Sequence, residues 1–148
     1  MREAVGALFF FNPRQALLSS PIAETVRRTG IPEIFERDGR VWIGVPERAM
    51  QCLFVSARSH EACHPVGVAL YERPTFDVLA ISHVAANLEY ASQRNNRGAG
   101  LGVLLVGKIV EIAHCIKGVT RVQMPYREDC FLRLGDGFCW SGARYRPW

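Results

Sequence analysis

The segment Leu101–Lys117 constrains the fold more than any other part of the chain. Its polar positions are spaced three residues apart, and every other position is Val, Leu, Ile, Ala, Cys or Gly; the polar ones are Lys108, Glu111, His114 and Lys117. A helix with so narrow a polar stripe buries most of its surface against a sheet. The sequence therefore predicts an α/β domain in which this helix covers a sheet and ends at Gly118.

The other apolar segments complete a mixed α/β (α+β) pattern with hairpin-length connections between its first strands. We expect strands at 3–11, 40–45, 51–56, 65–71, 77–90 and 119–124, short helices within 13–30 and at 128–134, and further strand material from Phe138 to Trp148. A chain of 148 residues with 49% hydrophobic and 22% charged residues is typical of one globular domain, here residues 1–148.

Composition also limits the partners and the compartment. No apolar run is long enough to span a membrane, and residues 3–11 are interpreted as a buried strand rather than a signal peptide. Five cysteines without a CxxC pair favour reduced thiols and a cytoplasmic location. The net charge of +4 comes from dispersed arginines, so the sequence carries no clear sign of nucleic-acid binding.

The segment Arg97-Gly98-Ala99-Gly100-Leu101-Gly102 lies between a long apolar strand and the start of the apolar helix. Glycines allow the backbone to approach a ligand, and the first turn of a helix offers unpartnered N–H groups to phosphate. The dinucleotide pattern GxGxxG fails at Val103. The GxxxxGK match at Gly102–Lys108 lacks the required Ser or Thr and lies inside the helix, which argues against a P-loop.

The segment 97–102 does fit the pattern (Q/R)xxGx(G/A), and in its strand–loop–helix context it resembles the GNAT superfamily of acyl-CoA-dependent N-acetyltransferases. The resemblance implies a mostly antiparallel central sheet flanked by helices. It implies that acetyl-CoA (coenzyme A) is bound with its pyrophosphate at Arg97, Gly98, Ala99, Gly100, Leu101 and Gly102, and its pantetheine arm at Leu88, Tyr90 and Ser92. The acceptor would be an amine on a small molecule or peptide, no metal would take part, and a homodimer is possible.

The strand 77–90 offers candidates for the base that deprotonates the amine. Alternation places His83, Ala85, Asn87 and Glu89 on one face, and a glutamate or histidine can accept a proton directly or through water. Glu89 and His83 are the candidate bases. The alternative is purely structural: Glu89 pairs with an arginine such as Arg94, and His83 is a hydrogen-bonded core histidine.

The general acid departs from the pattern of the family that the chain resembles. Members often carry a tyrosine five residues before the Phe of a Gly-Phe pair, and here that position is Arg133, counted back from Phe138. Tyr126 is the substitute candidate for the acid that protonates the leaving thiolate. The missing tyrosine leaves a second function open, a non-catalytic GNAT-fold module that binds acyl-CoA or a protein partner.

A third function follows from His60-Glu61-Ala62-Cys63-His64, which matches the zinc motif HExxH. That motif needs a helix, which would place both histidines on one face. Pro65 follows at once and strand-like sequence lies on both sides, so a hairpin tip is the better interpretation. A zinc hydrolase at His60 and His64 is the less favoured alternative.

Overall fold

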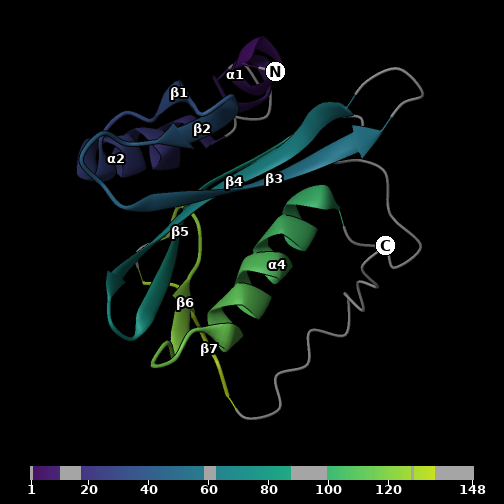
Figure 1. Ribbon diagram of the computed structural model, residues 1–148. Helices are drawn as coiled ribbons and strands as arrows, with labels where there is room; N and C mark the ends of the chain where they lie inside the picture. The colour runs from purple at the N-terminus through teal and green to yellow at the C-terminus, as the bar shows by residue number, and fades with distance from the viewer. Residues whose placement is uncertain (1, 11–17, 59–62, 88–99, 128, 136–148) are drawn as a thin grey trace.

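The computed structural model describes residues 2–10, 18–58, 63–87, 100–127 and 129–135 (Figure 1). The helices in this part are α1 (Arg2–Phe10), α2 (Ser19–Thr29) and α4 (Leu101–Cys115). The strands are β1 (Glu33–Arg37), β2 (Arg40–Gly44), β3 (Met50–Arg58), β4 (Cys63–Thr75), β5 (Val78–Ala86), β6 (Arg121–Gln123) and β7 (Phe131–Arg133). None of the helices in these ranges is long and apolar enough to cross a bilayer.

Five of the strands form one sheet in the order β3-β4-β5-β6-β7, and β1 and β2 form a separate antiparallel hairpin. Only β5 and β6 are parallel neighbours within the described sheet, because α4 connects them and carries the chain back to the starting end. The mixed α+β class with a mostly antiparallel sheet, predicted from the sequence, is confirmed.

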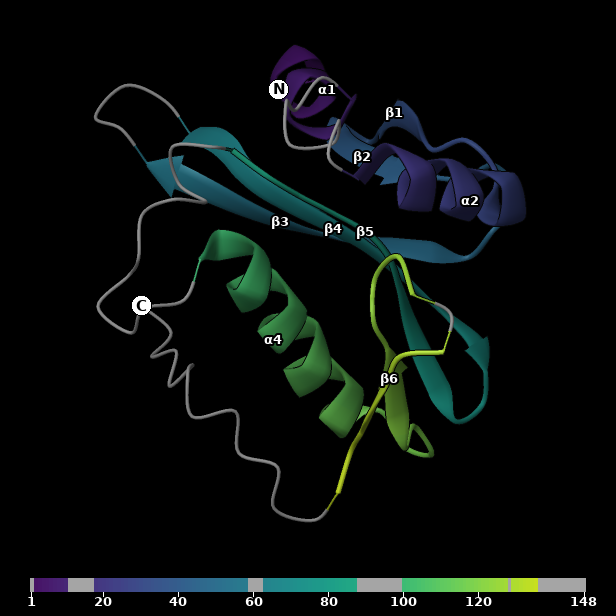
Figure 2. The same ribbon diagram turned by 180° about the vertical axis from the view of Figure 1, so that it is seen from behind.

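The sheet separates two layers (Figures 1 and 2). Helix α4 covers one face, where Leu105, Ile109 and Ala113 are almost fully buried against apolar residues of β4, β5 and β6. Helix α1 covers the other face, and α2 and the β1–β2 hairpin lie on that same side. The narrow polar stripe of α4 therefore has the predicted consequence that Lys108 and His114 face water, where Val103 and Cys115 are also exposed, and Lys108 pairs with Glu111 at 2.6 Å.

The prediction of a strand at residues 3–11 was wrong, because residues 2–10 form helix α1. Val5, Leu8 and Phe9 are the buried residues of α1, and their spacing of three and four is that of a helix face. Gly6 faces β1, where a Cβ would make an ordinary contact with Cδ1 of Ile34 at 3.6 Å. The run of aromatic residues at the end of this segment concealed its helical period.

The prediction of a short helix at 128–134 was also wrong, because residues 131–133 form strand β7. Leu132 and Leu134 pack against the α4 core, whereas Phe131 and Arg133 are exposed. This alternation has the period of a strand, and it was visible in the sequence. Strand β1, which the sequence analysis left unassigned, pairs with β2 from Glu33 opposite Gly44 to Arg37 opposite Arg40.

The other predicted elements are confirmed where the structure describes them. The helix in 13–30 begins at Ser19 and ends before Gly30, whose positive φ of 95° suits a residue without a side chain. The strands expected at 40–45, 51–56, 65–71 and 119–124 correspond to β2, β3, β4 and β6. The final segment from Phe138 to Trp148 and the end of the strand predicted at 77–90 lie outside the described residues.

Candidate functional site

The candidate site lies where β5 and β6 separate. Their parallel pairing covers only three residues on each strand, from Val78 opposite Arg121 to Ala80 opposite Gln123. β6 ends at Gln123, and beyond it Pro125, which has no N–H to donate, is followed by Tyr126 with a positive φ of 63°, which turns the chain. The connection between β6 and β7 curves back toward β5 as a result (Figure 2).

The hydroxyl of Tyr126 closes this opening on the β5 side. It accepts a hydrogen bond from the backbone N–H of Val84 at 3.1 Å and donates one to the carbonyl of the same residue at 3.2 Å. In a strand the N–H and C=O of one residue point to the same side, so the hydroxyl takes the place of a neighbouring peptide group. Tyr126 thus satisfies the edge of β5 at Val84, which the short strand β6 does not reach.

A β-bulge directs His83 toward the α1 face of the sheet. Leu70 pairs with His83 but the next residue, Tyr71, pairs with Ile81, so Ser82 is an extra residue in β5. Ile81 belongs to the core on the α4 side, whereas Ala85 belongs to the core on the α1 side. The extra residue therefore reverses the alternation, and a bulge of this kind re-aims the side chains that follow it.

His83 is buried between two aromatic rings. The imidazole makes an edge-to-face contact with Phe9 of α1 at a centroid distance of 5.7 Å and another with Tyr126 at 5.8 Å. Only 5% of the residue is exposed, and its Nε2 has no hydrogen-bond partner among the described residues. A buried acceptor or donor without a partner carries an energetic cost and calls for an explanation.

Burial sets the protonation states of His83 and Tyr126. Desolvation lowers the pKa of His83 from 6.5 to about 4, so the imidazole is neutral at pH 7 and one of its nitrogens is free to accept a proton or a hydrogen bond. Desolvation raises the pKa of Tyr126, opposed by its hydrogen bond with Val84, so the phenol keeps its proton. The site therefore places a neutral imidazole against a protonated phenol.

The first turn of α4 lies beside the same stretch of β5. A Cβ on Gly102 would be 3.9 Å from Cγ1 of Val84, so no bulky side chain separates the helix from the strand. On β4, a Cβ at Gly67 would be 3.0 Å from Leu105 and 3.2 Å from Leu101. These two glycines bring the positive end of the α4 dipole close to Val84.

The structure describes some of the predicted site residues and leaves others outside the described ranges. It brings His83 and Tyr126 together, and it places Gly100, Leu101 and Gly102 at the start of α4 on the other face of the sheet, where Gly102 lies beside Val84. Gly100 is the N-cap, with an extended backbone, and its carbonyl accepts from the N–H groups of Val103 and Leu104. The side chain of Leu101 is buried, so only its backbone could contact a ligand. The other predicted residues lie outside the described ranges; they are Leu88, Glu89, Tyr90, Ser92, Arg97, Gly98 and Ala99.

The last two residues of the HExxH segment lie in a strand. His64 is exposed and lies in β4, where it pairs with Ala57 of β3, and Cys63 pairs with Arg58. Residues 59–62 lie outside the described ranges and connect the two strands of this hairpin. Within the described part of the chain, no three His, Cys, Asp or Glu residues come together to form a metal site.

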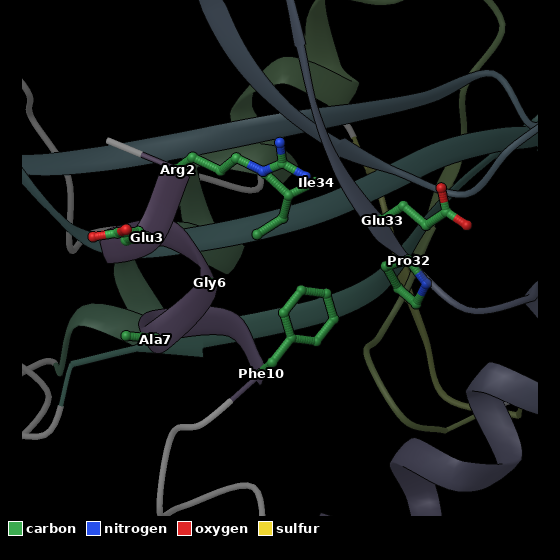
Figure 3. A pocket seen from close by; sticks show the side chains of 8 residues that line it. All are labelled: Arg2, Glu3, Gly6, Ala7, Phe10, Pro32, Glu33 and Ile34. Carbon is green, nitrogen blue, oxygen red and sulfur yellow. The ribbon is translucent and has the colours of Figure 1, made fainter.

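Among the described residues, an open pocket and a smaller one lie on the α1 side of the sheet, and neither is lined by His83 or Tyr126. An open pocket of about 880 Å³ lies between α1 and β1, lined by Arg2, Phe10 and Glu33 among others (Figure 3). A smaller one of about 450 Å³ lies between the β1–β2 hairpin, β3 and α1, and is lined by Val5 and Phe54 among others. We place the chemistry at the His83–Tyr126 pair because it holds a buried unpartnered polar atom, whereas the larger pocket is a surface depression.

Two residues of the site were missed by the sequence analysis. Phe9 forms one wall of the His83 environment, and the incorrect strand prediction for its segment concealed that role. Val84 contributes only its backbone, which no side-chain pattern reveals. Comparison with known protein families, curated proteins and solved structures finds no family, relative or structural neighbour that matches this chain.

Proposed function

We propose that the chain is a GNAT-like N-acetyltransferase that moves an acetyl group from acetyl-CoA to a primary amine by direct attack. The observation that carries this proposal is the contact between His83 and Tyr126 at the opening between β5 and β6. It joins a neutral imidazole and a protonated phenol next to Val84, whose side chain meets the first turn of α4 on the other face of the sheet, and the transfer needs one group that accepts a proton and one that donates it.

The reaction moves one proton from nitrogen to sulfur. The amine attacks the thioester carbonyl, and the C–N bond forms as the nitrogen gives up its proton toward His83, directly or through water. The intermediate then collapses, the C–S bond breaks, and Tyr126 donates a proton to the departing thiolate. A phenol whose pKa is raised by burial stays protonated until that step. Glu89 remains the alternative base.

The start of α4 supports the proposed position of coenzyme A. The first N–H groups of a helix have no partner within the helix, and they favour a phosphate together with the helix dipole. Gly100 and Gly102 add no side chain that would block such a ligand. In the proposed enzyme, the pyrophosphate binds at residues 97–102 and the thioester lies near Val84.

Calorimetric titration with acetyl-CoA tests the cofactor part of the proposal. We expect saturable binding to one site, and we expect Gly100→Trp to abolish it because the indole would fill the space in front of the helix. Gly135→Trp is the matched control, since Gly135 has no atom of another residue within 4 Å of a Cβ built on it. Equal affinity in both variants, or no binding by the wild type at millimolar ligand, would reject the proposal.

Turnover is measured separately, as release of free thiol with a panel of amines. We expect turnover with at least one class of acceptor, and we expect a double replacement of His83 and Glu89 by alanine to remove it. Full turnover in the double variant would reject both bases. Binding of acetyl-CoA without turnover on any acceptor would instead favour the non-catalytic acyl-CoA-binding module, for which the engaged state of the Tyr126 hydroxyl is the supporting observation.

A further inference from the structure

Two observations around Tyr126 belong together. Its hydroxyl is fully engaged with Val84, through one bond accepted and one donated. In the neighbouring imidazole, Nε2 of His83 is buried without a hydrogen-bond partner in the described part of the chain. The ring of Tyr126 contacts both groups, because it lies edge-to-face against the imidazole at 5.8 Å.

The Val84 contact blocks the edge of β5. A ligand that lies along β5 with an amide or thioester carbonyl needs the N–H of Val84 as a donor, and Tyr126 already occupies it. The ligand can replace the hydroxyl on Val84, but the displaced phenol then needs a new partner in a buried place. Nε2 of the neutral His83 is an acceptor that the free protein leaves unused.

We propose that Tyr126 is a two-position residue, whose hydroxyl holds Val84 in the free protein and moves to Nε2 of His83 when a ligand takes its place on β5. This inference rests on the proposed acetyl-CoA binding and adds a control of access to it. In the transfer itself the phenol turns from Nε2 of His83 to the thioester sulfur, which opens Nε2 to the proton of the amine. In the first position the phenol closes the edge of β5. In the second it leaves the edge open and is held by a histidine that is already in contact with its ring.

The turn that carries Tyr126 is suited to such a movement. Tyr126 has a φ of 63°, a conformation that a bulky residue adopts at a cost, so the turn is held in place partly by the contacts of the side chain. On the β6 side, the N–H of Met124 donates to the carbonyl of Cys130 and closes the connection to β7. The His83 ring is fixed on its other side by Phe9, so it offers a stationary acceptor.

The test compares acetyl-CoA affinity in wild type, Tyr126→Phe, His83→Phe and the double variant. Tyr126→Phe removes the competing hydroxyl, so we expect about five- to tenfold tighter binding. His83→Phe removes the second position, so we expect weaker binding when Tyr126 is present and no further change when it is Phe. Tyr71→Phe is the matched control: this tyrosine is buried on the α4 side of the same sheet, and its loss should leave the affinity unchanged.

Hydrogen exchange of the Val84 amide supplies a readout that is independent of turnover. In the free protein we expect slow exchange in wild type and Tyr71→Phe and faster exchange in Tyr126→Phe, with protection restored by acetyl-CoA. Tyr126→Phe binding acetyl-CoA as wild type does, or more weakly, would overturn the two-position inference and leave the acetyl-CoA proposal standing. If neither wild type nor Tyr126→Phe bound acetyl-CoA, the acetyl-CoA proposal and the two-position inference would both be overturned.

Discussion

The ring of Phe76 occupies the space in which a side chain on Gly118 would have to lie. A Cβ on Gly118 would be 2.1 Å from Cζ of Phe76. Arg73 stabilises this position of the Phe76 ring. Its guanidinium carbon is 4.9 Å from the centroid of that ring, and its N–H groups donate to the carbonyls of Phe76 and Lys117. The tip of the β4–β5 hairpin is thereby fixed to the end of α4, at the opposite end of β6 from the Tyr126 turn.

Replacement of Gly118 by alanine should destabilise the protein by roughly 1–3 kcal/mol, because the residue has a φ of 89° and the new Cβ meets Phe76. The free energy of unfolding in urea measures this loss. Adding Phe76→Ala should recover the steric part of the loss and leave the part due to φ. Gly135→Ala, at an open position, should change stability little; equal losses at the two glycines would contradict the explanation.

Replacement of Gly67 by alanine should also destabilise the protein, by about 1–3 kcal/mol, because a buried methyl group would press against the side chains of Leu101 and Leu105. Urea unfolding measures the effect, and Gly44→Ala is the matched control in a strand, with only ordinary contacts at 3.7 Å or more. The same variant should weaken acetyl-CoA binding, since it moves the first turn of α4 away from β5. An unchanged free energy of unfolding would show that α4 does not need this close approach.

His83 should make the protein less stable in acid. Its pKa is about 4 in the folded protein and about 6.5 when exposed, so the unfolded chain binds the proton first as the pH falls. The free energy of unfolding should decrease between pH 6.5 and pH 4 by up to about 3 kcal/mol. His83→Phe should lose this dependence, whereas His114→Gln, which changes an exposed histidine on α4, should keep it. Equal slopes in the two variants would disprove the assignment.

Asp77 should titrate below its ordinary range, because Thr75 donates a hydrogen bond to its carboxylate at 3.0 Å and Arg121 lies 3.0 Å away. A carboxylate with a lowered pKa contributes stability above its unfolded pKa and loses it as the pH falls through the folded one. Thr75→Val should therefore raise the pKa of Asp77, measured by NMR of the carboxyl carbon. Thr120→Val, at the exposed residue beside Arg121, should not; a shift in both would point to a general change of the turn.

The fold was predictable in segments where the spacing of apolar residues fitted one type of secondary structure and no other. Helix α4 has an apolar surface interrupted only by residues such as Lys108 and Glu111, and its place on the sheet followed from that pattern. Helix α1 was not predicted, because apolar residues such as Phe9 and Phe10 run together and hide the helical spacing. Strand β7 was missed because Leu132 and Leu134 alternate over too few residues to outweigh the short-helix interpretation.

The candidate site was predictable residue by residue but not as an arrangement. His83 and Tyr126 were named from chemical type and position, and their contact depends on two local departures from regular structure. One is the extra residue Ser82 in β5, and the other is the positive φ of Tyr126 after Pro125. Bulges and turns of this kind are set by the packing of the whole sheet, so a single sequence gives no direct signal for them.

The parallel pairing of β5 with β6 has a consequence for the nascent chain on the ribosome. The face of the sheet formed by Ala69, Tyr71, Leu79 and Ile81 is covered by a helix that is synthesised only after residue 100. Strands β3, β4 and β5 can pair earlier, because antiparallel hairpins form locally, but their apolar face then has no cover. A chain stopped at residue 100 should therefore bind a hydrophobic dye and aggregate, whereas the full chain should not; a soluble monomeric fragment would disprove this. During synthesis, the apolar face of the sheet is covered only once α4 has left the ribosome and packed against it.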